Sequence, residues 1–212
     1  MVHSPSIRAT LQYLATGDDG DAVYHASQAG GAAADHDGQY DLREVTIHDG
    51  RGRTLDLDGA GFMLMPHVSA ITDFHDDAAL GAVYEAEART VVVEVTGARR
   101  VEVFDHTRRA ASDSLRRRQI MREPSSVIHN DYTPWSAERR LRDILPDEAE
   151  ALLAGRFAII NIWRSIAGRV ETNPLAFCDS RTLAAGDLVE VTRQAQDRIG
   201  QIQMARFNAA HE

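Results

Sequence analysis

The chain has 212 residues, of which 43% are hydrophobic, and this size and composition fit one globular domain with a substantial core. Its formal net charge of minus 9 argues against a nucleic-acid surface, because phosphate binding needs a basic stripe. All 23 basic residues are arginines, which excludes a Schiff-base lysine and a P-loop lysine.

Cysteine content and hydropathy indicate a soluble protein. Cys178 is the single cysteine, which excludes an internal disulfide framework and CxxC metal sites and fits a reducing compartment. Residues 1–10 lack a signal-peptide pattern, and no apolar run approaches the length of a membrane span. We therefore expect a cytoplasmic location and neither a membrane nor a nucleic acid as a partner.

The first part of the chain predicts short strands. Residues 7–13 alternate as a strand does, and residues 17–38 are rich in Gly, Ala and Asp and indicate a loop or local disorder. Residues 44–48 predict a strand. The Asp49-Gly50 pair then favours a hairpin turn into a second strand at residues 54–57.

The middle of the chain predicts one helix and further strands. Residues 76–88 show helical spacing of apolar side chains, with Asp73 or Asp76 available as the N-cap. Residues 101–106 predict a strand. The arginines at 116–118 lie in a polar stretch and indicate a solvated loop or helix face.

The last part of the chain predicts two helices and several strands. Residues 137–153 are expected to be helical with a break at Pro146. Four apolar runs resemble strands, at 157–163, 175–178, 188–191 and 201–204. Many strands with few helices predict a mainly β protein of the α+β class, an antiparallel barrel or sandwich with helical cover.

The tripeptide His129-Asn130-Asp131 is a candidate metal-binding motif at the end of the strand-like run 125–128. Side chains alternate along a strand, so His129 and Asp131 are expected to project to the same side. One imidazole and one carboxylate can hold two positions of the 2-His-1-carboxylate triad of non-heme Fe(II) oxygenases. The alternative is an edge-strand histidine beside a turn-forming aspartate.

Polar side chains in the run 157–163 form a second candidate site. Asn161, Trp163 and Arg164 follow or interrupt the most apolar stretch, and a buried polar group needs a partner, which a substrate can provide. The alternative is that Trp163 packs in the core while Arg164 pairs with a carboxylate such as Asp179.

Several ordered motifs resemble one known family. The motifs are residues 129–133, 145–149, 156–164, 174–179 and 187–189, with residues 104–108 before them. This order closely resembles the hydroxylase/desaturase family that includes AsaB, CmcJ and NvfI-type oxygenases. The resemblance covers roughly the C-terminal half of the chain.

The resemblance implies a double-stranded β-helix (cupin-like jelly roll) oxygenase that uses Fe(II) with 2-oxoglutarate and O2 as co-substrates. The implied reaction is hydroxylation or desaturation of a small, natural-product-like molecule, coupled to conversion of 2-oxoglutarate to succinate and CO2. It also implies one oxygenase-like domain over residues 1–212, with variable strands and a helix in 1–98 and a partial β-helix core in 99–212. His129 and Asp131 match the family's first two iron ligands.

The resemblance further implies a distal iron ligand and a 2-oxoglutarate anchor, a later histidine and a still later arginine. The sequence ends before both, so we expect the β-helix to be incomplete at the C-terminus. His211 is then only a fallback third ligand.

Two other functions stay open. The likeness to CmcJ, a subunit associated with methoxylation, suggests a non-catalytic accessory subunit of a methoxylation or methyltransferase system, with a protein partner in a biosynthetic pathway. A methyltransferase acting alone ranks last, because no glycine-rich loop follows a strand.

Overall fold

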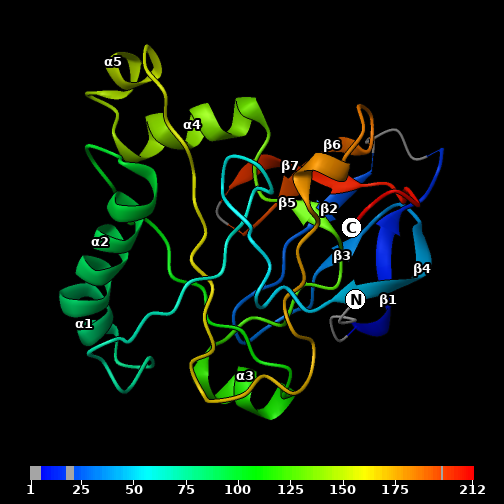
Figure 1. Cartoon of the computed structure of the whole chain (residues 1–212), viewed down its shortest axis with the longest axis horizontal. Coiled ribbons are helices and arrows are strands. Elements are labelled where there is room, and N and C mark those ends of the chain that lie inside the picture. The colour runs from blue at the N-terminus through cyan, green and yellow to red at the C-terminus, as the bar shows by residue number, and fades with distance from the viewer. Residues whose placement is uncertain (1–5, 18–21, 197) are drawn as a thin grey trace. The chain divides into compact units, whose positions relative to one another are not determined.

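The computed structural model describes residues 6–17, 22–196 and 198–212. The chain divides into two compact units (Figure 1). Unit 1 comprises residues 1–65, 109–139 and 175–212, and unit 2 comprises residues 66–108 and 140–174. Each unit is described by itself.

Two long strands of unit 1 form an antiparallel pair. Strand β1 (Ser6–Leu14) pairs with β4 (Tyr40–His48) from Ser6 opposite His48 to Leu14 opposite Tyr40. The strands predicted at 7–13 and 44–48 are therefore confirmed. The hairpin predicted through Asp49-Gly50 is wrong, because β4 pairs with β1 and residues 54–57 form no strand. Asp49 instead accepts a hydrogen bond from the backbone N–H of Arg51, at 2.9 Å, which closes a local turn.

A second sheet of unit 1 has five strands in the order β3-β2-β6-β7-β5. Strands β6 and β7 form an antiparallel hairpin, β2 runs parallel to β6, and β5 lies antiparallel to β7. Their bounds are β2 Val23–His25, β3 Asp35–His36, β5 His129–Asn130, β6 Leu188–Gln194 and β7 Ile199–Ala205. The strands predicted at 188–191 and 201–204 are confirmed.

Two of these strands were not predicted. Strands β2 and β3 lie inside the segment 17–38 that was predicted to be a loop, so that prediction is wrong for residues 23–25 and 35–36. Residues 18–21 of the segment lie outside the described residues. Both strands are too short to show an alternating pattern, and the neighbouring strands supply their hydrogen bonds.

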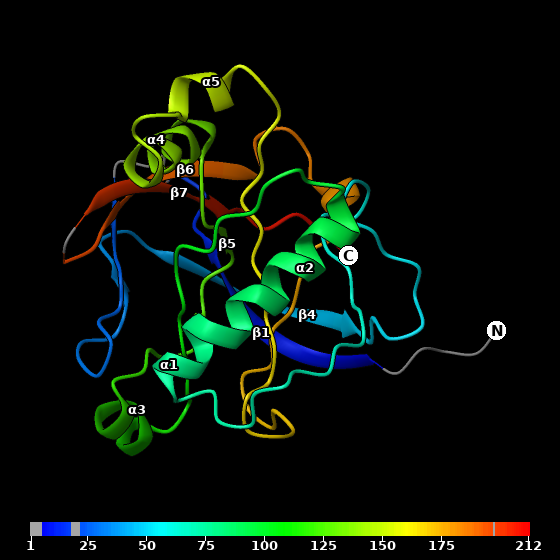
Figure 2. The same ribbon diagram turned by 90° about the vertical axis from the view of Figure 1, so that its left-hand side faces the viewer.

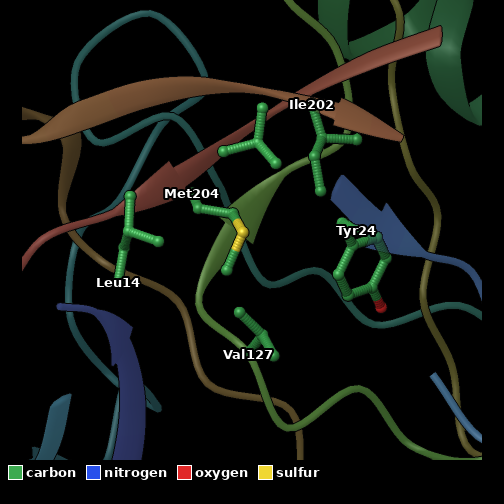
Figure 3. Close-up of a cluster of buried hydrophobic side chains, with 6 residues drawn as sticks. Leu14, Tyr24, Val127, Ile202 and Met204 are labelled. Carbon is green, nitrogen blue, oxygen red and sulfur yellow. The ribbon is translucent and has the colours of Figure 1, made fainter. Parts of the chain in front are cut away.

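The core of unit 1 lies on one face of the five-stranded sheet. Figure 3 shows its buried side chains converging from several strands. The cluster consists of Leu14, Tyr24, Val127, Val191, Ile202 and Met204. The opposite face carries Gln201 and Gln203. Their side-chain oxygens accept hydrogen bonds from Thr133 and Asn130 respectively, each at 3.0 Å.

Unit 2 contains a long helical segment (Figure 2). It begins with α1 (Asp77–Ala79), passes through a π-helical stretch at Leu80–Tyr84 and continues as α2 (Glu85–Thr96). Asp76 caps its start by accepting hydrogen bonds from the backbone of residues 78 and 79. The helix predicted at 76–88 is confirmed, and it extends to Gly97, whose φ of 67° ends it.

The other helices also follow the predictions. Helix α4 (Pro134–Ile144) and helix α5 (Ala149–Leu153) flank the break at Pro146. Helix α3 (Asp113–Gln119) carries the arginines at 116–118, two of which pair with Asp113. The interpretation of that stretch as a solvated helix face is confirmed.

Three predicted strands are wrong. Residues 101–106, 157–163 and 175–178 have irregular backbone and no strand partner among the described residues. Trp163 and Phe177 are half exposed, so these runs do not bury both faces as a central strand does. Phe177 stacks on Phe62 with ring centroids 4.8 Å apart, a side-chain contact that needs no strand pairing.

Candidate metal centre

Strand β5 places His129 and Asp131. The preceding residues join β1 through a bridge between Gln12 and Val127, and His129 pairs with Met204 of β7. The run before His129 is therefore held on two sides, as expected for a strand that delivers a ligand. Because Asp131 follows two residues later, its side chain returns to the side of His129.

The two side chains meet with the geometry of neighbouring metal ligands. His129 Nε2 lies 3.2 Å from Asp131 Oδ1. Two ligands at a right angle around a first-row divalent metal, with bonds of about 2.1 Å, lie about 3.0 Å apart. The pair therefore fits two adjacent coordination positions.

A backbone carbonyl orients the imidazole. His129 Nδ1 lies 2.8 Å from the carbonyl oxygen of Val127, which can only accept a hydrogen bond. Nδ1 can therefore donate its proton to this carbonyl, and Nε2 faces Asp131. When a metal replaces the proton on Nε2, that nitrogen can act as the ligand. Metal-binding histidines typically donate a hydrogen bond from the ring nitrogen that does not bind the metal, often to a backbone carbonyl.

The surroundings of His129 act on its charge in opposite directions. Burial lowers the pKa of His129, but the hydrogen bonds to Asp131 and to the Val127 carbonyl raise it, and the net direction is upward. Its ring stacks on Tyr24, with centroids 6.5 Å apart. Tyr24 was missed by the sequence analysis, because it lies in the segment predicted to be a loop.

His211 lies in a different set of contacts. Its Nε2 is 2.9 Å from Asp187 Oδ2, and both side chains are largely buried. Its ring also lies against Tyr13 at 6.3 Å. Within the described part of the chain, no group of three His, Cys, Asp or Glu side chains is arranged to hold a metal. The structure thus brings His129 and Asp131 together, and His211 is engaged with Asp187.

The second candidate site lies in unit 2. Arg164 stacks over the rings of Phe74 and Tyr84, at 4.6 and 5.6 Å from their centroids. Asp179, the example given of a carboxylate that Arg164 could pair with, is bound by Arg181, whose Nε lies 2.8 Å from Asp179 Oδ1. The Arg181 side chain is also the main cause that lowers the pKa of Asp179 to about 2.

The other two residues of that site are exposed. Asn161 and Trp163 both have exposed side chains in irregular backbone, and 50% of Trp163 is accessible. The alternative in which Trp163 packs in the core is therefore wrong. An exposed tryptophan remains available to a ligand.

A family model described as "Oxidoreductase/YMDC permease-like domain" matches residues 11–212. The chain is 29% identical to oxidoreductase AN1597 of Emericella nidulans, covering 90% of this chain and 66% of that protein. It is 28% identical to alpha-ketoglutarate-dependent dioxygenase phiK of a fungal species, covering 95% and 72%. It is 32% identical to hydroxylase/desaturase CTB9 of Cercospora beticola, covering 71% and 50%.

The chain therefore spans between 50% and 72% of the length of these three relatives. No described helix combines the length and apolar character needed to cross a bilayer.

The fold is that of a solved oxygenase structure. The iron and alpha-ketoglutarate-dependent endoperoxidase NvfI superposes with a TM-score of 0.81 at 24% identity, covering 98% of this chain and 77% of that one. The predicted cupin-like jelly roll with helical cover is thereby confirmed. With the family model matching 11–212, the chain belongs to the family described as "Oxidoreductase/YMDC permease-like domain", and the predicted kinship with the hydroxylase/desaturase group is confirmed.

Proposed function

We propose that this protein is a non-heme Fe(II)/2-oxoglutarate-dependent oxygenase that hydroxylates or desaturates a small, natural-product-like molecule. The observation that carries the proposal is the contact of His129 Nε2 with Asp131 Oδ1 at 3.2 Å, with the imidazole oriented by Val127. The names of relatives, a dioxygenase and a hydroxylase/desaturase, support the reaction class.

The residues of the chain have distinct roles in this proposal. Fe(II), with 2-oxoglutarate and O2, supplies the oxidising chemistry when bound. His129 offers Nε2 because its other nitrogen is held by a carbonyl, and Asp131 offers a carboxylate oxygen. Met204, opposite His129 on β7, and Val127, two residues before it, are buried and keep water away from that side of His129.

His211 is kept as a fallback third ligand. A facial triad needs one further histidine beside His129 and Asp131. His211 would first have to give up its contact with Asp187 at 2.9 Å. This requirement makes the His129–Asp131 pair the part of the site on which the proposal depends.

We further propose that both compact units serve one oxygenase-like domain. The family model crosses the division between them, since it matches residues 11–212. Asn161, Trp163 and Arg164 are proposed as substrate contacts, supported by the exposed indole of Trp163.

A cytoplasmic location and a protein partner in a biosynthetic pathway are also proposed. Cys178 is a free cysteine, which agrees with a reducing compartment. Several large apolar side chains are exposed on the described surface, such as Leu64 and Val68, and they offer area to a partner. Co-purification of a biosynthetic enzyme with the native protein would test the partner.

The test of the main proposal is substitution of Asp131. Asp131→Ala is expected to abolish stoichiometric Mn(II) or Fe(II) binding and 2-oxoglutarate-dependent succinate formation. Asp143→Ala, at an exposed position of α4, is the matched control and should bind metal as the parent does. Unchanged metal binding by Asp131→Ala, measured by equilibrium dialysis, would contradict the proposal.

A further inference from the structure

The outer edge of strand β1 lacks a strand partner over its first part. On its inner side β1 pairs with β4 along its whole length (Figure 2). On its outer side, within the described part of the chain, it forms two isolated bridges, at Gln12 and at Leu14, and none at residues 6–11. Residues 6–11 are therefore an open sheet edge, and an open edge can pair with another strand.

The backbone of this edge has a defined orientation. The carbonyl oxygen of Gln12 accepts a hydrogen bond from the backbone N–H of Ile128 at 3.0 Å, so it points away from β4. In an antiparallel pair the backbone groups of alternate residues point to the same side, so those of Arg8 and Thr10 also point away from β4. These two residues can offer their N–H and C=O groups to a strand placed against the edge.

The two faces of β1 differ in polarity. Ile7, Ala9 and Leu11 share one face, which is apolar, and Ile7 is 56% exposed. The opposite face carries Arg8, whose guanidinium pairs with Glu44 of β4. A partner strand with the same alternation would continue the apolar face and cover Ile7.

The free edge of β4 is less suited to pairing. It carries Asp41, Arg43 and Glu44, and Arg43 Nε lies 2.8 Å from Asp41 Oδ2. Charged side chains on an edge strand discourage the addition of another strand. Residues 6–11 of β1 contain a single charged residue, Arg8. The edge of β1 therefore has much less of this protection.

A second copy of the same edge is a partner that residues 6–11 fit. When two identical strands pair antiparallel about a two-fold axis, one residue must face its own copy. If Arg8 faced itself, two like charges would lie opposite each other, which is destabilising. If Thr10 faced itself, Arg8 would lie opposite Gln12, whose carbonyl is already bonded to Ile128.

A pairing centred on Ala9 avoids both problems. Arg8 of one copy then lies opposite Thr10 of the other, and such a pair exchanges both of its backbone hydrogen bonds. Ala9 faces itself at a position without these bonds, where Cα atoms approach to about 4.5 Å and a small side chain fits. Ile7 lies opposite Leu11, so the apolar face continues across the contact.

We infer that the protein associates as a two-fold dimer through the outer edge of β1, with Ala9 facing Ala9 of the second copy. The β1–β4 pairs of the two copies then form one continuous antiparallel sheet. The inference is independent of the proposed oxygenase function, because it uses neither His129 nor Asp131. The contact is small, so the association is expected to be reversible.

Disulfide trapping tests the register. Cys178→Ser removes the single native thiol, and Ala9→Cys, Arg8→Cys and Thr10→Cys are compared in that background. Under mild oxidation Ala9→Cys should form a covalent dimer at least tenfold faster than the other two, because residue 9 alone faces its own copy within the reach of a disulfide. Leu42→Cys, at an exposed position of β4, measures the rate of random collision.

Sedimentation velocity tests the association without a cross-link, over about a hundredfold range of protein concentration. Ile7→Lys places a charge beside Leu11 of the second copy and should weaken the dimer at least tenfold. Leu42→Lys makes a matched change on β4, at a side chain that is 60% exposed, and should leave the dimer unchanged. Both variants should keep the circular dichroism spectrum of the parent, since both side chains are exposed in a single copy.

Three outcomes overturn the inference. The first is a parent protein that stays monomeric over the whole concentration range. The second is a dimer that Leu42→Lys weakens as much as Ile7→Lys does. The third is that Ala9→Cys cross-links no faster than Leu42→Cys.

Discussion

The β6–β7 hairpin and the run 157–163 are both rich in apolar residues, yet only the first forms strands. In the hairpin, Val191, Ile202 and Met204 are at most 2% exposed. They alternate with the polar residues Glu190, Thr192, Gln201 and Gln203. In the run, Ile162 is 43% exposed and the backbone is irregular. Alternation with a paired neighbour, and not apolar content, distinguishes the two regions.

The largest expected effect tests this difference directly. Ile202→Ala should lower the free energy of unfolding by about 3 kcal/mol, because it leaves a cavity in a packed core. Ile162→Ala, the same chemical change in the irregular run, should cost less than about 1 kcal/mol. Urea denaturation followed by circular dichroism measures both, and equal losses would erase the distinction between the two regions.

The helical segment of unit 2 offers a more local test. Asp76→Ala removes the side chain that accepts from the backbone of residues 78 and 79, at 2.9 and 3.1 Å. We expect a loss of about 1 kcal/mol. Hydrogen exchange of those two amides should accelerate, whereas Asp143→Ala should leave it unchanged. Unaltered exchange would show that the cap does not hold the start of α1.

Substitution of His36, at the edge of the five-stranded sheet, is expected to stabilise the protein, whereas the preceding substitutions destabilise it. His36 is 5% exposed, and neither ring nitrogen has a hydrogen-bond partner among the residues that the structure describes. His36→Leu is expected to raise the free energy of unfolding by up to about 1 kcal/mol, because it removes buried polar atoms that are not satisfied. A loss above that size in urea denaturation would indicate that the imidazole is bonded to water or a ligand.

The smallest effect is confined to acid. The pKa of Asp179 is lowered to about 2, mainly by the Arg181 side chain, from an unfolded value of about 3.9. Because the pKa of Asp179 is lower in the folded protein, ionised Asp179 stabilises the fold at pH values above the pKa of the unfolded chain. This stabilisation is lost as the pH falls from about 4 to about 2. Asp179→Asn should flatten the thermal melting temperature against pH in that window, with Asp143→Asn as the control. If the slope of melting temperature against pH is the same in Asp179→Asn as in the parent, Asp179 is not the group that stabilises the fold in this pH range.

The elements that the sequence predicts well are those whose signals are local. The alternation in β1 and β6, the Asp76 cap and the break at Pro146 each need only a few neighbouring residues. The same holds for His129 and Asp131. They are two residues apart along a strand-like run, so their side chains project to the same side. The family resemblance, and not these patterns, supplied the iron chemistry and the jelly-roll fold.

What could not be predicted depends on pairings between distant segments. Tyr24 reaches His129 only because β2 pairs with β6, and β2 has three residues in a stretch rich in Gly, Ala and Asp. No local pattern marks Tyr24, and the irregular backbone of residues 157–163 was equally hidden.

The parallel pairing of β2 with β6 also affects the order of folding. It joins residues 23–25 to residues 192–194. The two paired segments are therefore separated by most of the chain, and bringing them together costs conformational entropy. The β2–β6 pairing that holds Tyr24 in place cannot form before β6 has been synthesised. Such long-range contacts slow folding, whereas the helical segment of unit 2 can form early from contacts near in sequence.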